Sequence, residues 1–267
     1  MKSLRMQTVS DLLIPRVGGI LSADIAVPEH EREIGFYSRV LCTGEDPLWQ
    51  EDLLNNRGMP IIGLGERSEE YVDLPLQWMP HIQVADVAAS WERALSLGAS
   101  GLMHGKGDNG ISQWAVLLDL NGAAFGIVPV VSADALPPTN GDTRVGCISW
   151  LDLTVSGASL TRDFYRQVVG WSVEDVETRG ASDRYADYNM LGDDGNRAAG
   201  ICHARGIDQE VPPVWMIYLP VGDLAESLRR VSDGGGSVIR TERRTDGEYA
   251  YAVIQDPVGA CLALMPG

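Results

Sequence analysis

The chain has 267 residues, of which 45% are hydrophobic and 22% are charged, so it is long enough for two globular domains of ordinary size. Its formal net charge is −16, and this charge disfavours a nucleic-acid backbone or an anionic membrane as a partner because both would repel the protein. The charge places no limit on a small organic ligand, which can bind in an apolar cavity inside an acidic shell.

The cysteines and the N-terminus indicate a cellular location. Cys42, Cys147, Cys202 and Cys261 lie far apart and form no Cys-X-X-Cys pair, which is typical of reduced, packed thiols. The apolar run at 12–14 is too short for a signal peptide or a membrane span. We therefore expect a cytoplasmic protein without membrane association, either a monomer or a homodimer.

The first predicted elements follow residues 1–17, which we interpret as a tail or an extra strand. Apolar side chains alternate with polar or small ones along 20–27, as in a strand with one buried face. A helix is expected at 28–40 and a strand at 59–65, whereas the rest of 42–75 shows no clear pattern.

The second unit contains one helix and four strands. The helix is expected at 86–97, with Asp86 as its N-cap and Gly98 as its end. The strands are expected at 77–84, 101–104, 112–118 and 123–130. Residues 131–144 contain two prolines, one glycine and no apolar period, so we predict a linker there.

The third and fourth units repeat this order. In the third unit a strand at 150–155 leads to small residues, including Ser156 and Ser159, that are expected to cap a helix from Leu160 to Gly170. Further strands are expected at 171–177, 185–191 and 198–203. The fourth unit is expected to contain a helix at 223–231 and strands at 214–221, 237–241, 249–255 and 260–265.

Internal repeats show how these units are grouped. Two pairs of segments align almost element for element: 78–100 with 215–237, and 114–129 with 251–266. Self-similarity on this scale predicts duplicated domains. We therefore predict an α+β protein with two copies of one domain, 18–130 and 145–267, each made of two β-α-β-β-β units.

Three segments of the sequence resemble the vicinal oxygen chelate superfamily, which includes glyoxalases, bleomycin-resistance proteins and extradiol dioxygenases. The segments are 150–171 with its Phe-Tyr pair, 221–238, and 255–266 with its Asp-Pro-X-Gly turn. The resemblance implies two tandem glyoxalase-like domains, of the type found in antibiotic-related proteins, in which each pair of units curls into an open, U-shaped sheet. Catalytic members hold a divalent metal ion inside this cup through His and Glu side chains.

The metal positions that the resemblance implies carry the wrong side chains here. In this sequence they fall on Trp150, Met216 and Ala263 in the second domain and on Ser22, Met79 and Gly126 in the first. A divalent cation prefers imidazole or carboxylate donors, which none of these residues supplies. We therefore predict that neither cup holds a metal ion and that no cofactor is required.

Polar residues stand two positions beyond the metal positions, on the same face of each first strand. If the two halves of a cup are related by a pseudo-twofold axis, Asp24 faces His81 and Asp152 faces Tyr218. The first pair could act as a general base or acid, and the second could polarise a hydroxyl or carbonyl group. Two alternatives remain open. Either pair could be a buried structural contact, and Asp24 with His81 could instead be two ligands of a displaced metal ion.

Large apolar residues form the other candidate site. Trp150, Met216 and Met265 are expected to face the second cup, Met79 faces the first, and Trp114 lies on a wall strand. Indole and thioether groups suit a flat organic ligand. The alternative is that these side chains pack on one another as core.

Three functions are compatible with these residues. The first is metal-independent binding of an aromatic or natural-product-like small molecule. The second is an enzyme of secondary metabolism with the same fold, namely a lyase, isomerase, cyclase or hydroxylase that uses an Asp/His or Asp/Tyr pair. The third, a metal-dependent glyoxalase or dioxygenase, is disfavoured by the replaced ligands.

Overall fold

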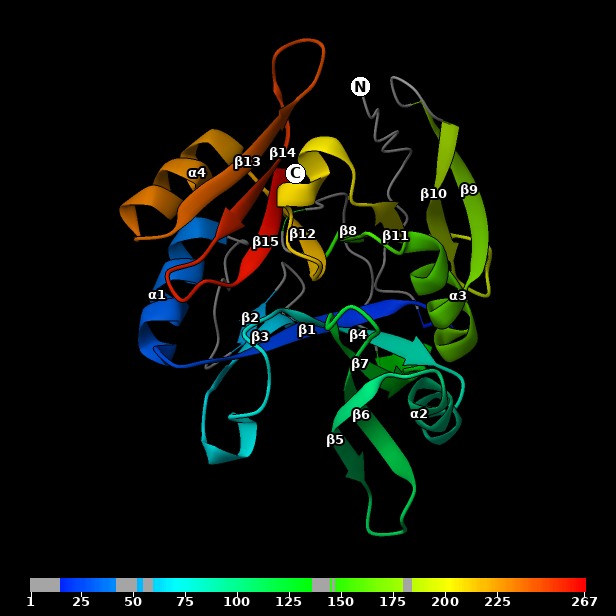
Figure 1. Cartoon of the computed structure of the whole chain (residues 1–267). Coiled ribbons are helices and arrows are strands. Elements are labelled where there is room, and N and C mark those ends of the chain that lie inside the picture. Colours follow the sequence, from blue (N-terminus) through cyan, green and yellow to red (C-terminus); the bar gives the residue numbers. More distant parts are fainter. Residues whose placement is uncertain (1–14, 42–51, 55–59, 136–144, 146, 180–183) are drawn as a thin grey trace. The chain divides into compact units, whose positions relative to one another are not determined.

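The structure is a computed structural model that describes residues 15–41, 52–54, 60–135, 145, 147–179 and 184–267. These residues form four modules, each of which begins with a strand followed by a helix and further strands (Figure 1). Within this described part of the chain, every helix is too short or too polar to cross a bilayer.

The four modules follow one another along the chain. The first comprises β1 (Ile20–Val27), α1 (His30–Leu41), β2 (Asp52–Leu54) and β3 (Pro60–Glu66). The second comprises β4 (Met79–Val84), α2 (Val87–Ser96), β5 (Ser100–Lys106), β6 (Ser112–Leu118) and β7 (Ala124–Pro129). The third comprises β8 (Trp150–Val155), α3 (Ala158–Val169), β9 (Ser172–Arg179), β10 (Arg184–Leu191) and β11 (Arg197–His203). The fourth comprises β12 (Trp215–Val221), α4 (Leu224–Asp233), β13 (Ser237–Arg243), β14 (Tyr249–Gln255) and β15 (Cys261–Pro266).

The strands form two open sheets. The strand order is β2-β3-β1-β4-β7-β6-β5 in the seven-stranded sheet and β13-β14-β15-β12-β8-β11-β10-β9 in the eight-stranded sheet. Within each module the first strand pairs in parallel with the last: β1 with β3, β4 with β7, β8 with β11, and β12 with β15. These sheets confirm the predicted α+β fold with duplicated units. The second, third and fourth modules are β-α-β-β-β units, and the described residues of the first form β-α-β-β.

The contacts also group the chain into two compact units that do not follow the order of the modules. Unit 1 comprises Met1–Leu21, His81–Ala133 and Trp150–Trp215, so it contains most of the second and third modules. Unit 2 comprises Ser22–Pro80, Asp134–Ser149 and Met216–Gly267, which are most of the first and fourth. The predicted domain limits and the linker at 131–144 stay predictions, and 136–144 lie outside the described residues.

One hydrogen bond recurs between the two helices of each unit. In unit 1, Ser90 of α2 donates to the carbonyl oxygen of Val168 in α3 at 2.8 Å. In unit 2, Ser227 of α4 donates to the carbonyl oxygen of Val40 in α1, also at 2.8 Å. Both carbonyls belong to the last turn of a helix, where no intrahelical donor is left for them. The contact therefore fixes α2 beside α3 and α1 beside α4 (Figure 1).

The predicted helix caps are found in the structure. Asp86 accepts a hydrogen bond from Ala89 N at 3.0 Å, and Gly170 ends α3 in the left-handed conformation with φ 90°. The small residues 156–159 that are predicted to cap α3 include its N-cap, Gly157, which makes no side-chain bond. Ser159 lies inside the helix, and its hydroxyl is 3.0 Å from the hydroxyl of Tyr188.

A buried hydrogen-bond chain joins α3 to the β6–β7 turn in unit 1. Trp215 Nε1 donates to the Tyr165 hydroxyl at 2.7 Å, and this hydroxyl donates to Asp119 at 3.3 Å. Asp119 also accepts from the backbone N–H groups of Asn121 and Ala123, at 2.7 and 2.9 Å. The hydrogen-bond chain thereby satisfies the buried polar atoms of the turn at 119–122.

Candidate functional site

Each module places one predicted polar site residue beside a small residue of the parallel neighbouring strand. The register pairs are Asp24 with Gly63, His81 with Gly126, Asp152 with Gly200, and Tyr218 with Ala263. A methyl group on any of the three glycines would meet the polar side chain, at 2.6 Å from Asp24 Oδ1 and 2.5 Å from His81 Cδ2 in the first two cases. The glycines therefore leave room for these side chains to lie over the adjacent strand.

The two predicted catalytic pairs each have their members in different compact units. Asp24 and Tyr218 belong to unit 2, whereas His81 and Asp152 belong to unit 1. The proposed facing of Asp24 with His81, and of Asp152 with Tyr218, accordingly stays a prediction.

The third module concentrates polar groups on one face of β8 and β11. Along β8, Trp150 and Asp152 are half-buried, and they alternate with fully buried Leu151 and Leu153 on the opposite face. On β11, Cys202 Sγ lies 3.6 and 3.8 Å from the two carboxylate oxygens of Asp152. A thiol is a weak donor, so this contact is a weak hydrogen bond to the carboxylate.

The indole of Trp150 has an unsatisfied donor on this face. Its Nε1 atom is buried and has no hydrogen-bond partner among the described residues. The ring also lies next to Gly200, since Cζ2 is 3.3 Å from the position that a Cβ atom there would occupy. Buried indole N–H groups normally find an acceptor, so this one is available to an oxygen atom of a ligand or of water.

The structure shows a second polar group on the third module that the sequence analysis missed. Asp187 Oδ1 accepts a hydrogen bond from His203 N at 2.8 Å and lies 3.3 Å from His203 Nδ1. The rings of Tyr185 and Tyr188 lie 5.5 and 5.9 Å from the imidazole, and 14% of the His203 side chain is exposed. A carboxylate at Nδ1 orients the ring and leaves Nε2 for proton exchange.

A second carboxylate accompanies Asp24 in unit 2. Gly63 pairs with Asp24 of β1 on one side and with Asp52 of β2 on the other. The Oδ1 atoms of the two aspartates lie 2.6 and 3.0 Å from the position of a Gly63 Cβ atom, so both carboxylates share one face. Asp52 was missed because it belongs to the stretch without a clear sequence pattern.

The remaining predicted ligand-binding residues differ in exposure. Met79, Met216 and Met265 are buried, with exposed fractions of 4, 3 and 2%. This burial is compatible with lining a closed cavity and with filling the core, so both interpretations stay open. Trp114 is 39% exposed and its ring covers Gly105 of the neighbouring strand.

The donor atoms at the positions implied by the resemblance do not fit a divalent metal ion. Trp150, Met216 and Ala263 offer an indole, a thioether and a methyl group. Nowhere in the described ranges do three His, Cys, Asp or Glu side chains come together as a metal-binding group.

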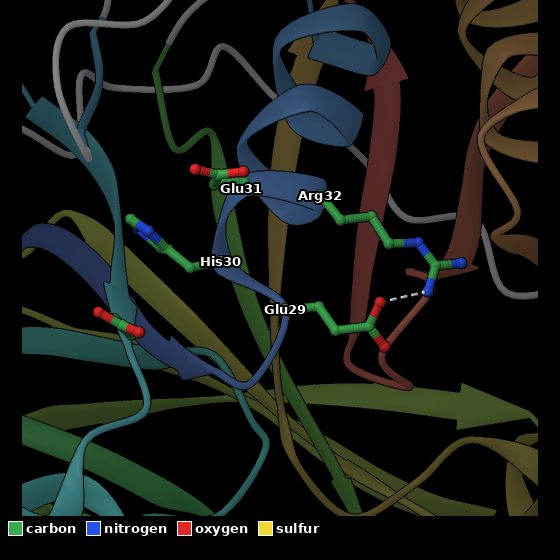
Figure 2. Close-up of a pocket in the computed structure, with 5 residues that line it drawn as sticks. Glu29, His30, Glu31 and Arg32 are labelled. Carbon is green, nitrogen blue, oxygen red and sulfur yellow. Dashed lines mark hydrogen bonds and ion pairs between the residues drawn. The ribbon is translucent and has the colours of Figure 1, made fainter.

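A hollow at the start of α1 offers little for ligand binding (Figure 2). A ring nitrogen of His30 lies 2.6 Å from the carbonyl oxygen of Leu64, and Arg32 pairs with Glu29 at 2.8 Å. Both basic side chains are thus engaged, and the hollow is negatively charged. Its lining comprises Glu29, His30, Glu31, Arg32 and Glu66.

Comparison with known proteins relates the C-terminal part of the chain to one family. Residues 148–264 match the Glyoxalase/Bleomycin resistance protein/Dioxygenase superfamily. The anthracycline biosynthesis protein DnrV of Streptomyces peucetius is 29% identical over 131 residues, which cover 45% of this chain and 46% of DnrV. CFP32 of Mycobacterium tuberculosis (strain CDC 1551 / Oshkosh), whose name gives a provisional glyoxylase assignment, is 28% identical over 128 residues, or 48% of each chain. The matches therefore span about half the length of these curated relatives.

Solved structures with the same fold cover nearly the whole chain. The Mn(II)-bound glyoxalase from Novosphingobium aromaticivorans has a TM-score of 0.56 and 17% identity, and the alignment covers 95% of this chain and 83% of that one. A variant of 4-hydroxymandelate synthase from Streptomyces coelicolor has a TM-score of 0.53 and 14% identity, covering 95% and 93%. At these identities the likeness shows the fold alone, and it confirms the predicted tandem of glyoxalase-like domains.

Proposed function

Since residues 148–264 match the glyoxalase, bleomycin resistance protein and dioxygenase superfamily, we propose that this chain uses the fold to bind a small organic molecule without a metal ion. The ligand that the residues favour is flat and aromatic, and it carries a carbonyl or hydroxyl oxygen. The observation that carries this proposal is the Nε1 atom of Trp150, which is buried and has no hydrogen-bond partner among the described residues. The sequence resemblance implies a metal ligand at this position.

The chemistry around Trp150 supports this ligand class. The indole supplies a polarisable surface for an aromatic ring and one donor for an oxygen atom of the ligand. Asp152 and Cys202 add polar atoms on the same face of the sheet. Similarity to a protein of anthracycline biosynthesis supports a polyketide-like ligand, because anthracyclines are flat and rich in carbonyl and hydroxyl groups.

Calorimetric titration with alizarin, a dihydroxyanthraquinone, tests this proposal. We expect Trp150→Ala to weaken binding by about tenfold or more, because it removes both the stacking surface and the donor. Trp150→Phe keeps an aromatic surface and should lose only the smaller part of the affinity, which depends on the N–H group. The control is Trp91→Phe, since Trp91 of α2 packs against His104, with ring centroids 4.5 Å apart. Equal affinity in the wild type and both Trp150 variants would contradict the proposed site.

The same protein preparation tests metal independence. Binding is expected to be unchanged after dialysis against a chelator. Stoichiometric iron, manganese, nickel or zinc in the purified protein, together with loss of binding on its removal, would contradict the proposal.

A second candidate function, proton-transfer catalysis, is favoured by the oriented imidazole of His203. Asp187 fixes this ring on the module that carries Trp150 and Asp152. A lyase, isomerase or cyclase needs such a base to remove a proton from an aromatic natural product. If His203 transfers the proton, His203→Gln should lower turnover while ligand binding persists. A pH profile of turnover that does not change in this variant would exclude that role.

A further inference from the structure

Unit 2 contains its own buried hydrogen-bond chain. Trp78 Nε1 donates to the Tyr37 hydroxyl at 3.2 Å, and this hydroxyl donates to Asp256 Oδ2 at 2.7 Å. Asp256 Oδ1 accepts from the backbone N–H groups of Val258 and Ala260, at 3.1 and 2.7 Å. Asp256 therefore ties α1 to the β14–β15 turn, as Asp119 ties α3 to the β6–β7 turn in unit 1.

A second carboxyl group lies buried within electrostatic reach of Asp256. Glu33 of α1 stands one helical turn before Tyr37 and has no exposed surface. Both of its carboxylate oxygens are buried, and no donor among the described residues reaches them. Two ionised carboxylates offer acceptors only, so this arrangement leaves charge and acceptor atoms unsatisfied.

The equivalent place in unit 1 is occupied by neutral residues. Thr161 lies one turn before Tyr165, as Glu33 lies before Tyr37, and Asn121 stands two residues after Asp119 where unit 2 has Val258. Asn121 Nδ2 donates to Asp119 Oδ2 at 3.2 Å and to Thr161 Oγ1 at 2.9 Å. In unit 1 an amide thus supplies the donor that unit 2 lacks.

We propose that a proton bound between Glu33 and Asp256 replaces the amide of unit 1, so that unit 2 contains a buried proton-binding site that holds α1 against the β14–β15 turn. A protonated Glu33 becomes a donor toward Asp256, which satisfies both carboxyl groups at once. Loss of this proton leaves two buried negative charges facing one another.

The surrounding groups favour the protonated form. The pKa of Glu33 is raised to about 8. Burial is the largest cause and the charge of Asp256 the next, whereas the charge of Arg32 lowers this pKa and that of Glu29 raises it. Burial also raises the pKa of Asp256 itself, opposed by the donors Tyr37 and the turn backbone. The Tyr37 pKa lies well above its ordinary value because the hydroxyl is buried. Cys261, whose thiol pKa is raised to about 11 by burial, also stays neutral at pH 8.

The sign of the pH dependence follows from these directions. Glu33 loses its proton near pH 4.5 in the unfolded chain and near pH 8 in the native one. Between these pH values the native state holds one more proton than the unfolded chain. The contribution of this proton to the free energy of unfolding is therefore complete below pH 4.5 and is lost as the pH rises toward 8. The unfolding constant should therefore increase by up to about tenfold per pH unit in this window and level off above it.

Urea unfolding of the full chain between pH 5 and 9 tests the site. We expect Glu33→Gln, which keeps a neutral donor, to remove about one proton from the pH dependence of the unfolding constant. Glu31→Gln is the matched control, because Glu31 is an exposed carboxylate of the same helix, and it should leave the slope unchanged. Identical slopes in the wild type and Glu33→Gln would overturn the proposal.

Infrared spectroscopy of the wild type provides a test that needs no variant to fold. The C=O stretching band of a buried, protonated carboxyl group is expected at pH 6.5 and should disappear above pH 9; its absence at pH 6.5 would overturn the proposal. The double variant Glu33→Thr with Val258→Asn copies the arrangement of unit 1 and should remove the band while restoring stability at alkaline pH.

Discussion

Gly18→Ala is expected to destabilise unit 1 by about 3–5 kcal/mol. Gly18 has φ 84°, which alanine adopts only with strain, and an added methyl group would collide with the indole of Trp171. This indole cannot move aside easily, because it is 2% exposed and its Nε1 donates to the carbonyl oxygen of Gly18 at 2.9 Å. Urea unfolding of the variant at constant pH measures the loss.

Gly195→Ala is the matched control for this substitution. Gly195 belongs to the same unit and has φ 76°, but nothing lies within 4 Å of the position of its Cβ atom. Its replacement should therefore show the backbone strain alone, about 1–2 kcal/mol. Equal losses in the two variants would contradict the collision with Trp171.

The position of most elements could be predicted because the determinants are local. The strand at 150–155 is read directly from alternation, and the structure gives β8 the same bounds. The cap at Asp86 requires one side chain and one nearby N–H group. The internal repeat then extends these local predictions to the whole fold, since a pattern that is weak in one copy is clearer in the other.

Features that depend on long-range register could not be predicted in this way. β2 has three residues and exists because it pairs with β3, so its own sequence carries no period. The contact of His203 with Asp187 requires the register of β10 and β11, which contains a bulge near Leu191. Likewise, the pairing of α2 with α3 depends on Ser90 reaching a helix end far along the chain.

The candidate site likewise contains features that local spacing predicts and features that depend on long-range packing. The face on which Asp152 and Trp150 lie follows from the period of two along β8, so it could be predicted from spacing. The unsatisfied state of Trp150 Nε1 could not, because it depends on which acceptors the other strands place around the ring. Glu33 was assigned no role for a similar reason: on a surface helix a glutamate is ordinarily solvated, and its burial in the structure depends on tertiary packing.

Asp119→Ala is expected to cost unit 1 about 3–5 kcal/mol of unfolding free energy, because each buried donor left without a partner costs about 1–3 kcal/mol. The carboxyl of Asp119 is the shared acceptor of the β6–β7 turn and of α3. Its removal leaves the backbone N–H of Ala123 and the hydroxyl of Tyr165 unsatisfied, and both residues are fully buried. Thermal and urea unfolding measure this loss.

Asp119→Asn separates the hydrogen bonds of Oδ1 from those of Oδ2. The amide oxygen can still accept from the two turn N–H groups, whereas the amide NH2 group replaces Oδ2, which accepts from Tyr165 and Asn121. We expect a loss of about 1–3 kcal/mol, smaller than that of Asp119→Ala. If Asp119→Asn were as damaging as Asp119→Ala, the contacts of Oδ2 would be the stabilising feature of the turn. Because β7 also carries Gly126, which gives His81 its space, an unstable turn would disturb that part of the candidate site before the unit unfolds.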